Sequence, residues 1–205
     1  MGRWTEALIA KCWKALLKGR IMAKSAVVFV ANGCEPVEVV APVDALRRGG
    51  VDVVLAAVSD DLTVRAAQAV TLQADAPLST LDLTQFDIAI VPGGSVGVDN
   101  LGKSQRVVAE LRRRVEAGEY VAAICAGPMV LANAGLLTGR KAVCYPGCEE
   151  GWPAGIYQAG KDVFVDGNLI TATGPGTALS FGIQILRTLE GDKVADEVAS
   201  GMLLK

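Results

Sequence analysis

Short apolar runs alternate with helical patterns along most of the chain. Apolar runs short enough to be buried strands occur at 26–31, 51–58, 88–91, 120–124 and 169–172. Between and after them, apolar residues at helical spacing and capping residues predict helices at 36–49, 104–117, from 128 onward, 177–189 and 193–199. Strands alternating with helices predict an α/β domain with a mostly parallel sheet and helices on both faces.

Two segments have the pattern of antiparallel hairpins. Residues 64–72 read as two short strands joined by a turn, and residues 163–165 and 169–172 flank the turn pair Asp166-Gly167. Neither segment changes the α/β assignment.

Residues 1–21 differ from the rest because they combine apolar residues at helical spacing with lysine and arginine. We therefore divide the chain into a basic amphipathic extension, 1–21, and a domain, 22–205. The extension fits a mitochondrial presequence, although it contains Glu6 and no serine. It also fits a surface or partner-binding helix. A third interpretation, a misassigned start, is slightly favoured because Met22 leads straight into a strand.

Composition narrows the function classes. Hydrophobic residues make up 51% of the chain and aromatic residues only 5%, so the core is expected to consist of Val, Ala, Leu and Ile. The net charge of −2 gives no general basic surface for nucleic acid. No apolar run approaches the roughly 20 residues that span a bilayer. The 5 cysteines are odd in number and irregularly spaced, which favours the cytoplasm, or the mitochondrion if 1–21 is a presequence.

The chain has no histidine among its 205 residues. This excludes Ser-His-Asp and Cys-His catalysis and histidine-ligated metals. Any proton transfer must therefore use a carboxyl group or water.

The strongest candidate nucleophile is Cys125. It follows a predicted strand and is surrounded by small residues, Ala123, Ala126 and Gly127, before Pro128 begins a helix. Small neighbours are needed where a nucleophile lies on a sharp strand-to-helix turn. The positive end of that helix is expected to lower the pKa of the thiol below its free value of about 8.5. The alternative, a small buried hydrophobic cysteine, is disfavoured by this context.

Two further segments end strands at the same edge of the predicted sheet. Gly93 and Gly94 permit unusual backbone angles, and their amides, with that of Ala126, are candidates to bind a developing oxyanion. Glu35 and Glu38 lie in the first turn of a predicted helix. The negative charge of Glu35 is expected to interact favourably with the positive N-terminal end of the helix dipole. Glu38 is the candidate acid and base, with a pKa raised by burial beside a thiolate.

These motifs resemble the ThiJ/PfpI superfamily, in particular its Parkinsonism-associated deglycase branch with the YajL-type proteins. The resemblance covers residue 25 to the C-terminus and includes the Gly-Pro-Gly-Thr turn at 174–177. It implies a flavodoxin-like α/β sandwich and a homodimer. It also implies Cys125 as the nucleophile and redox-sensitive thiol, Glu38 as its hydrogen-bonding acid, and the Gly94 and Ala126 amides around the reacting oxygen.

Two departures from this superfamily bear on activity. Its amidotransferases use a Cys-His-Glu triad and its protease branch has histidine directly after the cysteine, where this chain has Ala126. The absence of histidine therefore argues against both the amidotransferase and the protease activity. In the branch it resembles, a histidine often occupies the position of Tyr145, and an arginine often occupies that of Thr173. A phenol donates a hydrogen bond but does not titrate near neutral pH, and Thr173 weakens the case for an anion site.

The expected function is a cysteine-dependent glyoxalase or deglycase acting on methylglyoxal or glycated adducts, with a role in oxidative stress and no cofactor. The alternative is a non-catalytic redox sensor or chaperone switched by oxidation of Cys125. Cys144 and Cys148 suggest a metal or a disulfide, but two thiols without further ligands make a poor zinc site, so no metal is expected. Cys34 is either a resolving thiol or, as we favour, a filler of its turn.

Overall fold

A seven-stranded sheet forms the middle of the molecule in the computed structural model, which describes residues 23–204. The strand order is β5-β2-β1-β6-β7-β9-β8, and every neighbouring pair is parallel except β8 and β9. The strands are β1 (Ser25–Val30), β2 (Asp52–Ala57), β5 (Ala76–Pro77), β6 (Ile88–Val91), β7 (Tyr120–Ile124), β8 (Val163–Asp166) and β9 (Leu169–Ala172). The predicted mostly parallel sheet is confirmed.

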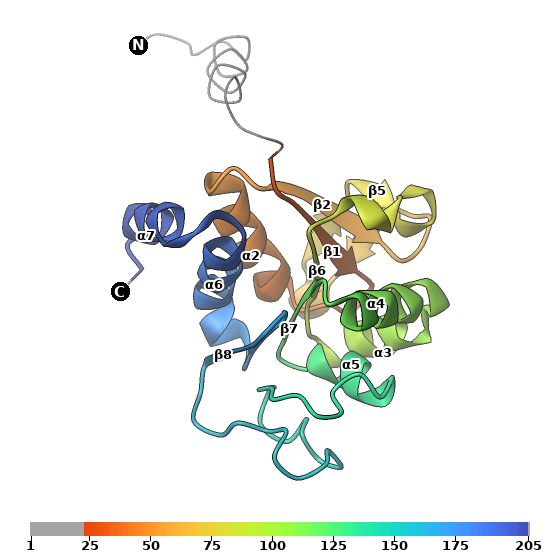
Figure 1. The fold of residues 1–205 in the computed structure, drawn as a ribbon. Coiled ribbons are helices and arrows are strands. Elements are labelled where there is room, and N and C mark those ends of the chain that lie inside the picture. The colour runs from red at the N-terminus through yellow and green to blue at the C-terminus, as the bar shows by residue number, and fades with distance from the viewer. Residues whose placement is uncertain (1–22, 205) are drawn as a thin grey trace, which may run out of the picture.

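Helices cover both faces of this sheet (Figure 1). One face carries α2 (Pro36–Arg48), α6 (Ala178–Glu190) and α7 (Asp192–Gly201), and the other carries α3 (Ser95–Lys103), α4 (Gln105–Ala117) and α5 (Pro128–Asn133). Side chains of β1 alternate between the two cores: Val28 belongs to the first, and Val27 and Phe29 belong to the second. This strand is buried on both faces, as its unbroken apolar run indicates.

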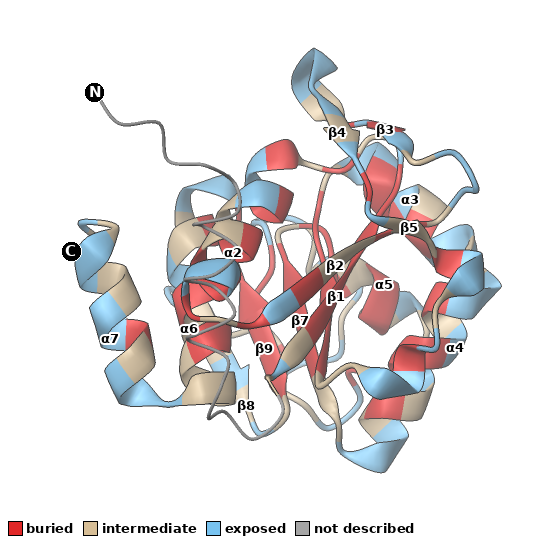
Figure 2. Ribbon diagram, turned by 90° about the horizontal axis from the view of Figure 1, so that it is seen from above, coloured by how far each residue is buried: buried red, intermediate tan, exposed pale blue. Residues whose placement is uncertain are grey.

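The hairpin predicted at 64–72 is a separate two-stranded sheet of β3 (Thr63–Arg65) and β4 (Thr71–Gln73), with Val64 opposite Leu72. It projects from one end of the domain (Figure 2). Backbone hydrogen bonds attach it to the turn after β1: the Gly33 N–H donates to the Arg65 carbonyl at 2.7 Å, and the Ala67 N–H donates to the Cys34 carbonyl at 2.8 Å.

Other elements differ in part from the sequence predictions. Helix α3 and the short strand β5 were not predicted, and α5 ends after only six residues. Short 3₁₀ turns occur at Ala67–Ala69, Leu78–Thr80, Leu83–Gln85 and Pro175–Thr177. The extension at 1–21 lies outside the described residues. Among the described helices, none has the length and apolar character needed to cross a membrane.

Candidate active site

Cys125 occupies the sharp turn between β7 and α5, with a φ of 62°. A residue with a side chain adopts this left-handed backbone at a cost of about 1–3 kcal/mol, so the surrounding structure must hold it there. The Cys125 N–H donates to the Ala172 carbonyl at 2.9 Å, and the Cys125 carbonyl accepts from the Tyr145 N–H at 2.9 Å. These bonds fix a partly exposed thiol at the carboxyl edge of the sheet.

Glu38, in the first turn of α2, is fully buried beside this thiol. Its Oε2 accepts from the Gly93 N–H at 2.8 Å. Its Oε1 is buried and makes no hydrogen bond among the described residues, while the carboxyl group as a whole interacts with the Cys125 side chain. Leaving a buried carboxylate oxygen unpaired is costly, whereas a protonated carboxyl becomes a hydrogen-bond donor.

The contact between Glu38 and Cys125 requires glycine at position 93. A β-carbon there would lie 2.6 Å from Glu38 Oε2 and 2.7 Å from Cys125 Cβ, which is too close for any side chain. Gly93 therefore allows the acid and the nucleophile to approach across its backbone. Its N–H is used by Glu38, so it does not face the reacting oxygen as the sequence analysis expected.

The amides of Ala126 and Gly94 point at the Cys125 sulfur, and both lower the pKa of the thiol. Gly94, with a φ of 86°, is also the residue that precedes α3. These two N–H groups are placed to stabilise negative charge on sulfur or on an oxygen bonded to the carbon that sulfur attacks.

The predicted lowering of the Cys125 pKa is wrong while Glu38 is ionised. Burial, and then the Glu38 carboxylate, raise the pKa of the thiol to about 12, which outweighs the two amides. Helix α5 has only six residues, so its dipole is a weak counterweight. Burial likewise raises the pKa of Glu38 to about 7. Near neutral pH the pair therefore carries at most one negative charge, which lies mainly on the carboxylate.

Tyr145 reaches the site mainly through its backbone. Its N–H bonds Cys125, its side chain is 51% exposed, and its ring lies against Gly174. The ring also lines a depression of about 390 Å³ together with Tyr157 and Lys161. Neither Tyr157 nor Lys161 could be identified from the sequence, because the segment between α5 and β8 has no periodic pattern.

The other residues singled out from the sequence lie outside the Cys125–Glu38 pair. Cys34 is fully buried in the core, and burial raises its pKa to about 11, which supports the filler interpretation. Glu35 precedes α2 without making a side-chain cap. Thr173 lines the depression beside Tyr145. The described residues include no cluster of three or more His, Cys, Asp or Glu side chains suited to a metal ion.

Comparisons with known proteins agree with this geometry. The sequence pattern of the DJ-1/PfpI family matches residues 24–188. The chain is 37% identical over 184 residues to protein dj-1beta of Drosophila melanogaster, covering 89% of this chain and 98% of that protein. It is 31% identical over 182 residues to glutathione-independent glyoxalase DJR-1.2 of Caenorhabditis elegans, covering 88% and 97%.

A solved structure gives the same result for the fold. Oxidized Toxoplasma gondii DJ-1 superposes with a TM-score of 0.85 at 34% identity, covering 88% of this chain and 98% of that one. The flavodoxin-like sandwich expected from the sequence motifs is thereby confirmed.

Proposed function

The chain belongs to the DJ-1/PfpI family, and on that basis we propose that it is a cysteine-dependent glyoxalase that converts methylglyoxal to lactate without glutathione. The observation that carries this proposal is the convergence on one sulfur of a buried carboxyl, Glu38, and two backbone amides, Gly94 and Ala126. The relative named as a glutathione-independent glyoxalase supports the same reaction class.

The proposed reaction begins when the Cys125 thiolate attacks the aldehyde carbon of methylglyoxal. The carbonyl electrons move to oxygen, and the Gly94 and Ala126 amides stabilise the charge until the hemithioacetal is protonated. Attack uses the form of the pair in which the remaining proton has moved to Glu38 and the charge is on sulfur.

Glu38 then removes the proton from the attacked carbon and returns it to the neighbouring carbon. The first carbon becomes a thioester carbonyl and the second becomes an alcohol carbon, so the oxidation and reduction balance within the substrate. Water hydrolyses the thioester and releases lactate and the free thiol. A carboxyl with a pKa of about 7 is suited to act as both acid and base near neutral pH.

The same chemistry extends to deglycation, because an adduct of a dicarbonyl with a thiol or amine presents the same carbons to Cys125. The depression lined by Tyr145, whose N–H bonds the Cys125 carbonyl, is the space that we assign to the remainder of such a larger substrate. We propose glycated adducts as further substrates and a homodimer as the working assembly, in the cytoplasm and in the oxidative-stress response.

The decisive experiment follows lactate formation from methylglyoxal by purified protein in the absence of glutathione. Cys125→Ser should fold normally and lose at least about 100-fold in kcat/KM, because serine is much harder to deprotonate and the chain has no histidine to assist. Cys148→Ser removes another partly buried thiol and is the matched control. A folded Cys125→Ser protein that keeps more than about a tenth of the activity would contradict the proposal.

A redox sensor or chaperone is the competing function. It is favoured by the partly exposed thiol beside a potential donor, and by the similarity to a DJ-1 solved in an oxidized form. Wild-type protein that oxidises at Cys125 but forms no lactate would select this alternative.

A further inference from the structure

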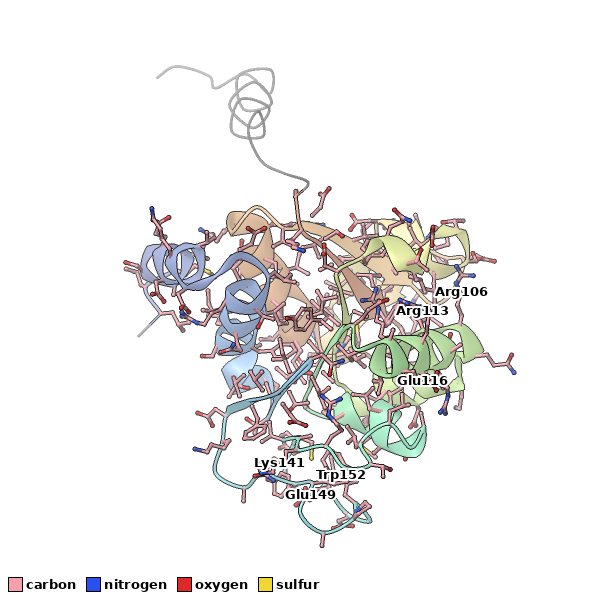
Figure 3. All side chains as sticks on the ribbon, in the orientation of Figure 1. Arg106, Arg113, Glu116, Lys141, Glu149 and Trp152 are labelled. Carbon is pink, nitrogen blue, oxygen red and sulfur yellow. The ribbon has the colours of Figure 1, made fainter. Side chains whose placement is uncertain are left out.

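A second pair of cysteines lies close to the active site without belonging to it. Cys144 and Cys148 flank the sequence Tyr145-Pro146-Gly147, in the long segment between α5 and β8. Figure 3 labels Glu149 and Trp152 in this segment. We propose that Cys144 and Cys148 form a reversible dithiol–disulfide pair, a second redox site that exchanges with small disulfides such as glutathione disulfide.

The backbone between the two cysteines folds back on itself. The Cys148 N–H donates to the Tyr145 carbonyl at 2.9 Å, and Gly147 has a φ of 95°. With Pro146 as the first central residue, this is the pattern of a type II turn, which brings its end residues within about 7 Å. Because Cys144 immediately precedes the turn and Cys148 ends it, the turn brings their backbones toward the range that a disulfide spans.

The Cys144 side chain lies over this turn. Its sulfur is 3.8 Å from Glu149 Oε2, the same oxygen that accepts the Gly147 N–H at 2.7 Å. Cys148 adjoins Glu149 in sequence and lies near enough to Cys144 to raise the pKa of the Cys144 thiol. The Cys144 sulfur thus contacts the residue next to Cys148.

The two thiols differ in solvent exposure, and from this difference we infer which of them reacts first with the external disulfide. Cys144 is fully buried, whereas Cys148 is partly exposed and lines a depression of about 350 Å³ with Met129, Trp152 and Ile156. Burial and Glu149 raise the pKa of Cys144 to about 12, and the same two causes raise the pKa of Cys148. Cys148 is therefore the thiol that meets the external disulfide, and Cys144 is the thiol that resolves it, with slow exchange.

The exchange balances in two steps. The Cys148 thiolate attacks one sulfur of glutathione disulfide, whose S–S bond breaks and releases one glutathione thiolate. The Cys144 thiolate then attacks the Cys148 sulfur, and the second glutathione leaves. The protein loses two protons and two electrons, and glutathione disulfide becomes two molecules of glutathione.

The cysteine pair is connected to the active site through the turn that lies between Cys144 and Cys148. The turn that the disulfide would close carries Tyr145, whose N–H bonds the Cys125 carbonyl and whose ring lines the substrate depression. Oxidation of the pair would therefore restrain one wall of the active site without consuming Cys125.

Trypsin separates the relevant cysteines cleanly. Residues 142–161, between Lys141 and Lys161, contain Cys144 and Cys148 alone, whereas Cys125 and Cys34 fall on two other peptides. Full-length Cys125→Ser protein is equilibrated in buffers of rising glutathione disulfide to glutathione ratio, then blocked with an alkylating agent, digested and weighed. The expected result is peptide 142–161 lighter by two hydrogens and unalkylated, and restored to double alkylation by excess glutathione.

Single variants test the assigned order. Cys144→Ser should accumulate a stable glutathione adduct on Cys148, because the resolving thiol is missing. Cys148→Ser should leave Cys144 alkylatable after unfolding, and Cys34→Ser should behave as the parent protein. The proposal is overturned if peptide 142–161 stays doubly alkylatable at every ratio, or if Cys144→Ser gains no glutathione. The Cys125→Ser background keeps this result independent of the proposed glyoxalase activity.

Discussion

A single shared charge governs the chemistry of Cys125 and Glu38. If both groups were ionised, two negative charges would be buried side by side, which is why the Glu38 carboxylate raises the pKa of the Cys125 thiol. If both were neutral, no nucleophile would exist. Between these extremes, the pKa of Cys125 is raised further than that of Glu38, so the resting charge lies on the carboxylate, and the amides of Gly94 and Ala126 favour transfer of the proton from sulfur to Glu38 when the thiol reacts.

Burial of Glu38 makes stability depend on pH. Its pKa rises from 4.5 in the unfolded chain to about 7 in the fold, so the native state binds more protons between these values, and stability falls as pH rises through them. Glu38→Gln has no titrating carboxyl at this position, so its stability should not fall over this pH range for this reason. Relative to wild type, the variant should gain up to about 3 kcal/mol of unfolding free energy on going from pH 4.5 to above pH 7.

Urea unfolding of both proteins across this pH range measures the effect, with Glu35→Gln, immediately before the same helix, as the control. If the difference in unfolding free energy between wild type and Glu38→Gln stays constant with pH, Glu38 does not titrate in the fold as described.

Tyr145 contributes to the site through its backbone N–H, which a phenylalanine at this position would keep. Its backbone N–H bonds Cys125, while its exposed ring only borders the depression. Tyr145→Phe should therefore change kcat/KM by no more than about tenfold, the value of one hydrogen bond. Steady-state kinetics with methylglyoxal test this, and a loss as large as that of Cys125→Ser would show that the phenol takes part in the chemistry.

At the scale of elements, most strands of the central sheet could be predicted from the sequence. Helix α3, which follows Gly94 of the active site, could not. Continuous apolar runs identified β1, β2, β6, β7 and β9 because strands buried on both faces have no polar positions. Helix α3 was missed because Gly97 and Gly102 weaken its helical pattern. Gly97 is needed by the fold, since a β-carbon there would lie 2.6 Å from the Cys34 backbone.

The same comparison explains which site residues could be found. Cys125 and Glu38 follow or begin elements whose ends the sequence marks, so their convergence was predictable from parallel-sheet topology. Tyr157 and Lys161 lie in an irregular segment held by individual hydrogen bonds, and no local pattern places them beside the site. The ionisation of the pair depended on burial, which the sequence does not quantify.

Helix α4 is anchored by a buried arginine. Arg114 is fully buried, pairs with Glu110 at 2.7 Å, and donates to the carbonyls of Leu83 at 2.9 Å and Phe86 at 2.8 Å. Arg114→Ala removes one of the two partners of the buried Glu110 and leaves two buried carbonyls without their donor, so it should cost about 3–5 kcal/mol of unfolding free energy. Chemical denaturation gives the value.

Arg113 on the same helix is the matched comparison (Figure 3). It pairs with Glu110 and Glu119 but is 35% exposed, so Arg113→Ala should cost no more than about 1 kcal/mol. Equal losses in the two variants would show that burial of Arg114 does not set its contribution.

On the scale of the whole molecule, the exposed apolar side chains near the active site point to an interface. Val37 and Val40 on α2 and Val96 on α3 are 47%, 52% and 59% exposed. The starts of these two helices are joined by the Glu35 N–H, which donates to the Gly93 carbonyl at 3.0 Å. Large apolar side chains gathered at one place on a surface are typical of association sites.

The homodimer inferred from the family resemblance should therefore use this face and not the arginines at the far end of α2. Arg48 pairs with Asp44, and Arg47 pairs with Asp75, so both already have partners within the chain. Sedimentation equilibrium at micromolar concentration should give a mass of two chains for wild type and for Arg48→Ala, but one chain for Val40→Glu, because a buried unpaired carboxylate disfavours association. A wild-type mass of one chain would contradict the dimer, and a dimeric Val40→Glu would place the interface on another face.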